Sequence, residues 1–288
     1  MKRNDPLYYL INACFIGAAL ICVDFPQIFG LEFSPMMIVA LCLLLLVVHG
    51  FKFLRMYFIL LEEKLPLWRA IKLYVKTTFV STLLPFKGGE LFKMYAYGVE
   101  INKFSKGIIA VLIEKFFDAI VLCLILFPCI LLSGGSNYTL PLLLLVFLIV
   151  TASVYWAYDG TYKYLNRFLV ANAKSRRGIR YLSLLEYIKG FFGTAKEMLR
   201  GRQMVIMLLS LLSWIAECGM VLTIGWFMGE KVGFEGITAY ISDGFFGVSN
   251  IFFNRYLYIF MAVFVVILVI VYVKKFISLI INKNRRKL

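Results

Sequence analysis

The chain has a single histidine, and charged residues make up only 16% of its 288 residues. One histidine, His49, excludes a metal site built from several histidines, and no neighbouring residues indicate a Ser-His triad. Neither a Walker A loop nor a Rossmann glycine fingerprint is present, which argues against ATP-driven transport by this chain alone. No hydrophilic stretch is long enough for a separate soluble catalytic domain. We therefore predict no cofactor and no metal site, we assign no catalytic residue, and we expect His49 to be passive.

Cysteine is also sparse, with six residues that all lie in apolar segments. Their spacing fits neither a zinc ribbon nor the disulfide framework of a small secreted protein. We expect them to act as small buried hydrophobic residues. They are Cys14, Cys22, Cys42, Cys123, Cys129 and Cys218.

Hydrophobic residues, in contrast, make up 62% of the chain, and the mean hydropathy is +0.86. A water-soluble domain of this size could not bury so much apolar surface, so the composition indicates an integral membrane protein. Apolar runs of about 20 residues, long enough to cross the hydrocarbon core as helices, recur along most of the sequence. We predict an all-α polytopic membrane protein that forms one domain over residues 1–288. The six candidate spans are Leu7–Phe29, Met36–Leu61, Gly107–Leu132, Tyr138–Tyr158, Met204–Met228 and Tyr256–Val273.

Two further apolar stretches do not read as clean spans. Leu67–Tyr97 is amphipathic and is broken at Pro85, and Phe234–Phe253 carries Asp243 among glycines. If each enters the membrane and returns to the side it came from, every basic loop lies on one side, as the positive-inside rule requires. The sequence thus predicts two re-entrant helical hairpins, 67–97 and 234–253, in an inverted repeat of residues 1–136 and 137–288. Both termini are then cytoplasmic.

The net charge of +15 comes from basic residues in short loops beside apolar helices. This arrangement is typical of membrane topology and of contact with anionic lipid, and it argues against nucleic-acid binding. Residues 159–203 form a basic connector, and Tyr181–Leu199 places its apolar residues on one helical face. We predict an amphipathic cytoplasmic helix in the membrane interface, with regulation or partner docking as the alternative role.

The first break contains the most informative motif, Pro85-Phe86-Lys87-Gly88-Gly89-Glu90. Proline cannot donate to the helical ladder, and the glycines loosen the chain directly after it. A helix that begins near Gly89 would point its free N–H groups, with Lys87 beside them, at an anion such as a lipid phosphate. The alternative is a surface turn in which Lys87 reaches water and Glu90 caps the helix.

Three ionisable residues, Glu114, Lys115 and Asp118, lie in the following apolar helix. Glu114 and Asp118 share a helix face, and Lys115 and Asp118 are spaced for pairing. The trio leaves at least one charge unbalanced, and Lys87 or Lys93 from the broken segment could balance it. Charges at this depth usually line a polar path or a binding site. An internal ion pair that fixes helix packing is the alternative.

Glu217 is a single carboxylate in a helix that is otherwise apolar or weakly polar. Such a residue is a candidate site for a proton, a cation or a sugar hydroxyl, and a protonated glutamate satisfied by a helix neighbour is the alternative. The second break offers weaker signals of the same kind. Asp243, Asn250 and Arg255 are the residues of this candidate second half-site.

The run from Arg69 to Lys93, followed by Val111–Asp118, resembles the flippase-like membrane family that includes the transmembrane domain of lysylphosphatidylglycerol synthase, or multiple peptide resistance factor. The family pattern is a proline, a short gap, Gly-Glu and a basic residue, then Glu-Arg and Asp on the next helix. Here Lys93 takes the first basic position and Lys115 replaces the arginine. The second half lacks the proline and the glutamate of the family pattern.

The resemblance implies translocation of a phospholipid, an aminoacylated lipid or a lipid-linked glycan across the bacterial inner membrane. The expected partners are membrane lipids and anionic lipid headgroups, and self-association into a homo-oligomer is left open. A membrane-embedded glycosyl or aminoacyl transferase and an accessory scaffold of a cell-envelope glycan assembly complex are the alternatives. The expected substrate-binding residues are Lys87, Gly88, Gly89, Glu90, Lys93, Glu114, Lys115, Asp118 and Glu217.

Overall fold

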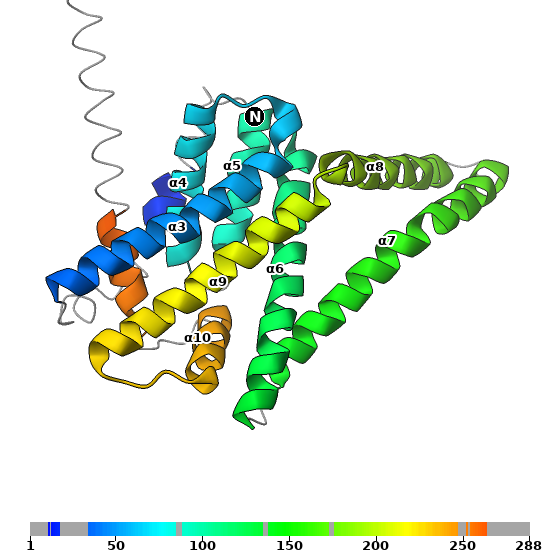
Figure 1. Ribbon diagram of the computed structural model, residues 1–288. Coiled ribbons are helices and arrows are strands. Elements are labelled where there is room, and N and C mark those ends of the chain that lie inside the picture. Colours follow the sequence, from blue (N-terminus) through cyan, green and yellow to red (C-terminus); the bar gives the residue numbers. More distant parts are fainter. Residues whose placement is uncertain are drawn as a thin grey trace, which may run out of the picture.

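The computed structural model describes residues 11, 13–17, 34–84, 88–134, 138–172, 176–246, 252 and 254–263. Helices account for nearly all of these residues, and the described ranges contain no strand. Figure 1 shows a bundle of helices from which one long helical hairpin extends. The predicted all-α fold class is confirmed.

Four helices in the described ranges are long and apolar enough to cross a membrane, which makes the chain a multi-pass membrane protein. Each corresponds to one predicted span. The other two predicted spans, Leu7–Phe29 and Tyr256–Val273, lie mostly outside the described residues, so the number of six stays a prediction. The four helices are α3 (Pro35–Ile59), α6 (Phe104–Ser133), α7 (Thr139–Asn172) and α9 (Gln203–Met228).

Local sequence explains where these helices begin and end. The Ser34 side chain accepts a hydrogen bond from the Met37 amide, and Pro35 occupies the first turn of α3, where it has no ladder bond to lose. Helices α6 and α9 end at Gly134 and Gly229, whose φ angles of 68° and 71° are left-handed and favour glycine.

The first break separates α4 (Leu67–Leu83) from α5 (Gly88–Ile101), and the two helices pack against each other. A Cβ atom at Gly89 would lie only 2.1 Å from the Cα atom of Ser81, so the backbones of α4 and α5 touch there. The predicted helix start just after Pro85 is confirmed, although Pro85 itself lies outside the described residues. Entry of this hairpin into the bilayer stays a prediction.

A second glycine contact joins α5 to α6. A Cβ atom at Gly107 would lie 2.4 Å from the backbone nitrogen of Gly98. Glycine at position 107 therefore lets α6 start directly against α5. Helices α4, α5 and α6 thus form one closely packed unit.

Helices α3 and α9 lie side by side and antiparallel, as Figure 1 shows. Their cytoplasmic ends, in the predicted topology, are tied to the start of α6 through the short helix η1 (Leu61–Glu63). Arg202 forms an ion pair with Glu62 at 2.7 Å, and Lys106 forms one with Glu63. The buried core that these helices share with α5 includes Leu41, Leu45, Phe92, Ile109 and Ile206.

The second break contains α10 (Phe234–Phe246), which packs against α6 and α9. Its 13 residues give a length of about 20 Å, shorter than the hydrocarbon core of about 30 Å. The predicted re-entrant segment 234–253 runs on into residues outside the description, so its path stays a prediction. Residues 254–263 are helical.

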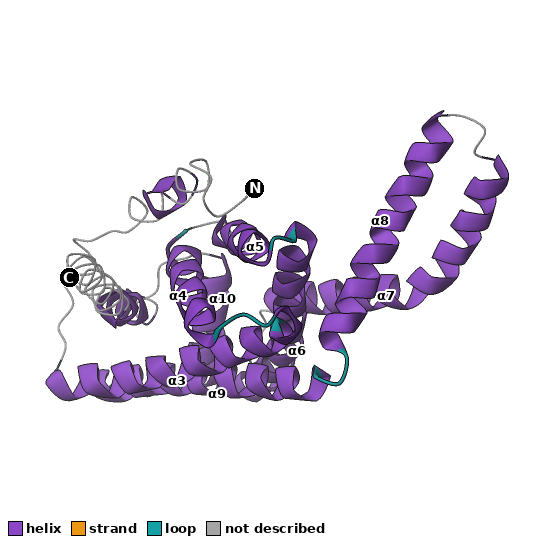
Figure 2. Ribbon diagram, turned by 90° about the horizontal axis from the view of Figure 1, so that it is seen from above, coloured by secondary structure: helices purple, strands orange, loops and turns teal. Residues whose placement is uncertain are grey.

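Helices α7 and α8 (Arg176–Leu199) form an arm that leads away from the bundle in Figures 1 and 2. The span that we predicted to end at Tyr158 continues as helix to Asn172, so the connector predicted over 159–203 begins inside α7. The rings of Tyr158 and Phe192 stack at 4.1 Å between centroids, and Lys196 pairs with Asp159 at 2.8 Å. These contacts hold the two helices of the arm together.

Candidate functional site

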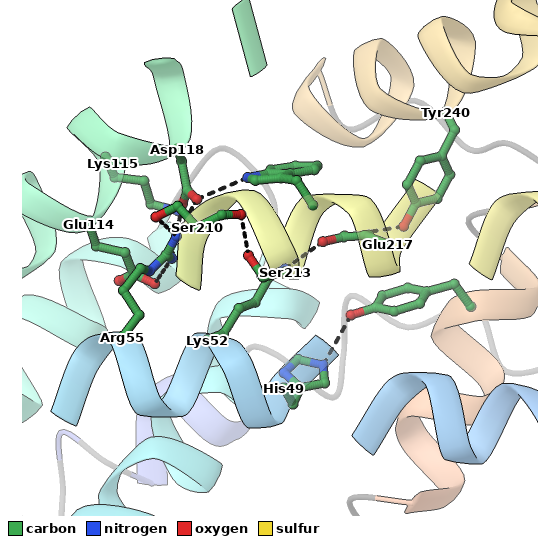
Figure 3. Close-up of polar contacts among 12 residues, drawn as sticks. His49, Lys52, Arg55, Glu114, Lys115, Asp118, Ser210, Ser213, Glu217 and Tyr240 are labelled. Atoms are coloured by element: carbon green, nitrogen blue, oxygen red, sulfur yellow. Dashed lines mark hydrogen bonds and ion pairs between the residues drawn. The ribbon is translucent and has the colours of Figure 1, made fainter. Parts of the chain in front are cut away.

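Arg55 of α3 stands at the centre of a buried charged cluster (Figure 3). Its side chain is 1% exposed and reaches carboxylates of α6. One terminal nitrogen donates to Asp118 Oδ1 at 2.5 Å and the other to Oδ2 at 3.2 Å, so the guanidinium and the carboxylate meet fork to fork. The second nitrogen also donates to Glu114 Oε1 at 2.7 Å, and the first donates to Ser210 Oγ of α9 at 2.9 Å.

Glu114 has a second cationic neighbour from the predicted first half-site. Lys93 Nζ of α5 lies 2.5 Å from Glu114 Oε2, and the two side chains are 6% and 4% exposed. The carboxylate therefore sits between Arg55 and Lys93. Lys93, one of the two lysines that we expected to balance the charges on α6, thus pairs with Glu114, whereas Asp118 is paired with Arg55.

Lys115 forms its ion pair with a different residue from the one that we predicted. It pairs with Glu90 of α5 at 2.6 Å, while Asp118 is held by Arg55. The predicted pairing of Lys115 with Asp118 is therefore wrong. The reason is that an arginine from another helix offers Asp118 a two-pronged contact, which a lysine one turn away cannot match.

Glu217 of α9 also has a partner that the sequence did not reveal. Lys52 Nζ of α3 lies 2.6 Å from Glu217 Oε2. Tyr240 of α10 approaches the other carboxylate oxygen at 3.4 Å, as Figure 3 shows. The partners of Glu217 thus come from α3 and α10 and not from a neighbour in its own helix.

Trp214 lies between these two groups of charges. Its indole N–H donates to Asp118 Oδ1 at 2.9 Å, and Lys52 Nζ lies 5.4 Å from the centroid of its ring. The first group, which we call the Arg55 cluster, consists of Arg55, Lys93, Glu114 and Asp118. The second, the Lys52–Glu217 pair, is completed by Tyr240.

The positive and negative charges of these side chains are equal in number. Four cations meet four carboxylates among these described residues, so the three charges on α6 are neutralised by side chains from α3 and α5. A charge buried without such a partner would cost several kcal/mol. The pairs are Arg55 with Glu114 and Asp118, Lys93 with Glu114, Lys115 with Glu90, and Lys52 with Glu217.

Neutral polar side chains surround the charges. His49 shares one hydrogen bond with Tyr74 of α4 at 3.0 Å and one with Tyr256 at 3.3 Å, so it links three elements of the bundle. Tyr97 of α5 is buried as well.

The other predicted site residues are distributed differently. Gly89 is buried against α4, whereas a Cβ atom at Gly88 would meet open space. Arg255 lies against the Met37 sulfur at 3.9 Å, about 27 Å along α3 from Arg55. Asp243 is on α10, one turn beyond Tyr240. Lys87 and Asn250 lie outside the described residues.

The described ranges contain no group of three or more histidine, cysteine or acidic side chains that could hold a metal ion. The basic side chains near the carboxylates are suited instead to polar or charged organic groups.

Sequence reasoning missed Lys52 and Arg55, because it interpreted basic residues at the ends of apolar helices as markers of membrane topology. In the structure both lie within α3, and both face the interior of the bundle. A signal was present: His49, Lys52 and Arg55 are spaced three residues apart in an apolar run, which places them along one helical face.

This combination of long apolar helices with balanced charges between them defines a polytopic α-helical membrane protein with a polar interior. Comparison with protein families matches residues 18–271 to the lysylphosphatidylglycerol synthase TM region. The chain belongs to that family, as its motif around Gly88 and Glu114 predicted, and is related to lipid modification or translocation. Comparison with curated proteins and with solved structures gives no match.

Proposed function

We propose that the protein is a flippase-like transporter that moves a polar or phosphate-bearing lipid across the bacterial cytoplasmic membrane. The observation that carries the proposal is the Arg55 cluster. Three helices, α3, α5 and α6, supply charged side chains that are at most 12% exposed and meet within one membrane bundle. Charges at such a position are costly to retain and usually mark the path of a substrate.

A bound lipid headgroup would replace some of the contacts within the Arg55 cluster by contacts of its own. Two oxygens of a phosphate can make the same bidentate contact with Arg55 that the two oxygens of the Asp118 carboxylate make, and Lys93 lies nearby as a second cation. An amine or hydroxyl of the headgroup would find acceptors in Glu114 and Asp118. A lipid that carries a phosphate and a polar terminus fits this mixed set of donors and acceptors.

The predicted topology places the cluster on the cytoplasmic side of the bilayer centre. Arg55 lies four residues before the end of α3, and Glu114 lies ten residues after the start of α6. The ends of α3, α6 and α9 that the ion pairs of Glu62 and Glu63 bring together are the ends that the basic loops assign to the cytoplasm. The cycle would therefore begin with a headgroup from the inner leaflet.

The test is lipid movement in proteoliposomes. We would reconstitute the purified protein with a fluorescent phosphatidylglycerol or phosphatidylethanolamine and measure the fraction that a membrane-impermeant quencher reaches over time. We expect the protein to accelerate exchange of one of these lipids. The variants Lys93→Gln and Glu114→Gln, each of which removes one charge of the cluster, should abolish the acceleration.

Lys196→Gln is the matched control, since Lys196 forms an ion pair with Asp159 in the α7–α8 arm. It removes the same kind of charge outside the cluster and should leave exchange unchanged. If the wild-type protein exchanges lipid no faster than empty liposomes, or if Lys93→Gln and Lys196→Gln behave alike, the proposed function is wrong.

A further inference from the structure

Trp214 contacts both charged groups of the interior. The N–H edge of its indole meets the Arg55 cluster, and the face of its ring meets the Lys52–Glu217 pair. Its indole N–H donates to Asp118 at 2.9 Å, and its ring lies 5.4 Å from the ammonium of Lys52. An aromatic face attracts a cation, and the polar edge of an indole is a hydrogen-bond donor only. The two contacts therefore depend on one side-chain orientation.

The contacts extend in both directions from Trp214. On one side, Asp118 binds Arg55, which binds Glu114, whose other oxygen meets Lys93 of α5. On the other side, Lys52 binds Glu217, whose second oxygen is approached by Tyr240 of α10. A continuous series of polar contacts thus joins α5, in the first predicted hairpin, to α10, in the second.

We propose that Trp214 is a positioning residue that couples the Arg55 cluster to the Lys52–Glu217 pair. When a headgroup draws Arg55 or Asp118 away, the indole N–H loses its acceptor and the ring turns. Lys52 then loses its contact with the aromatic face and moves relative to Glu217. This movement changes the hydrogen bond that Tyr240 donates to the Glu217 carboxylate. The inference rests on the proposed function for its view that a headgroup occupies the Arg55 cluster.

The first experiment follows the surroundings of the Trp214 indole, which change when the ring turns. The other three tryptophans are exposed, at 45% for Trp68, 91% for Trp156 and 70% for Trp226. Replacing these three with Phe leaves Trp214 as the only tryptophan emitter in the detergent-solubilised protein. We expect its emission maximum to shift both when Asp118→Asn is introduced and when Glu217→Gln is introduced.

The second experiment measures coupling with a double-mutant cycle, because a series of contacts alone does not demonstrate it. Asp118→Asn and Glu217→Gln are combined in the native chain and again in Trp214→Phe, which keeps an aromatic ring but removes the N–H donor. We expect the melting temperatures to be non-additive by about 2 °C or more with Trp214 and additive with Phe. Trp226→Phe, a change of the same kind at an exposed position of α9, should retain the non-additivity.

The outcomes separate the inference from its alternatives. Equal non-additivity with Trp214 and with Phe would show that the backbones of α3 and α9 or direct electrostatics carry the coupling, and additive behaviour in both would show that there is none. Either result overturns the proposal. If Asp118→Asn does not give folded protein, Arg55→Lys replaces it in the cycle, since it loosens the fork that orients Asp118 while keeping the charge.

None of these measurements requires lipid movement. Wild-type protein that moves no lipid but shows Trp214-dependent coupling would contradict the proposed function and leave the coupling intact. A transporting protein with additive cycles would contradict the coupling alone.

Discussion

Replacing Arg55 with Met tests whether the ion pairs hold the interior of the bundle together. The substitution keeps most of the length of the side chain but removes four hydrogen bonds, two to Asp118 and one each to Glu114 and Ser210. Glu114 retains Lys93 as a counter-ion. Asp118 keeps the indole N–H of Trp214 but loses its cation, so the cluster changes from neutral to a charge of about −1.

The size of the effect follows from that unbalanced carboxylate. Removing one partner of a buried ion pair costs about 3–5 kcal/mol, which for a chain of this size lowers the melting temperature by roughly 6–20 °C. Adding Asp118→Asn restores neutrality, so the double variant should recover part of the lost stability. The pattern of loss and recovery is therefore more informative than the loss itself.

Thermal unfolding of the detergent-solubilised protein measures both variants. Arg200→Met is the control, since Arg200 is exposed at the end of α8 and the same exchange of residue types there should change the melting temperature little. If Arg55→Met unfolds within the scatter of Arg200→Met, or if Asp118→Asn worsens the single variant instead of rescuing it, the network does not stabilise the fold as reasoned.

Two further predictions concern the two predicted hairpins. Gly89→Ala should destabilise the protein by about 1–3 kcal/mol in a thermal unfolding experiment, because its methyl group would overlap Ser81; the neighbouring Gly88→Ala, which meets open space, should not, and equal effects would refute the contact of α4 with α5. For the second break, a cysteine at Asn254 in a cysteine-free background should react with an impermeant thiol reagent from outside the cell; labelling only from the cytoplasm would rule out a hairpin over 234–253.

Much of the helical pattern could be predicted because a span leaves a strong local signal. A run of about 20 apolar residues bounded by caps specifies a membrane helix without reference to any other part of the chain. This is why the ends of α3, α6 and α9 fall within a few residues of the predictions. The end of α7 was misplaced because the sequence becomes polar near Asp159 while the helix continues into the arm.

The pairing of charges could not be predicted in the same way, because it depends on which helices become neighbours. Glu217 and Lys52 are 165 positions apart, and only the antiparallel packing of α9 on α3 brings them together. Arg55 was overlooked since a basic residue near a helix end usually reaches water. Its burial follows from carboxylates on α6 that the sequence of α3 does not reveal.

The glycine contacts indicate that the bundle consists of two groups of helices, each of which would move as a rigid body. Because backbone touches backbone at Gly89 and at Gly107, helices α4, α5 and α6 can slide or tilt against one another very little, and they form one stiff block. The antiparallel helices α3 and α9 form a second block, and Arg55 of α3 and Trp214 of α9 reach across the boundary between the two blocks to the carboxylates of α6. In the proposed transport cycle, a rocking movement would open along that boundary, and the ion pairs of Arg55 with Asp118 and Glu114 would have to break and form again in each cycle.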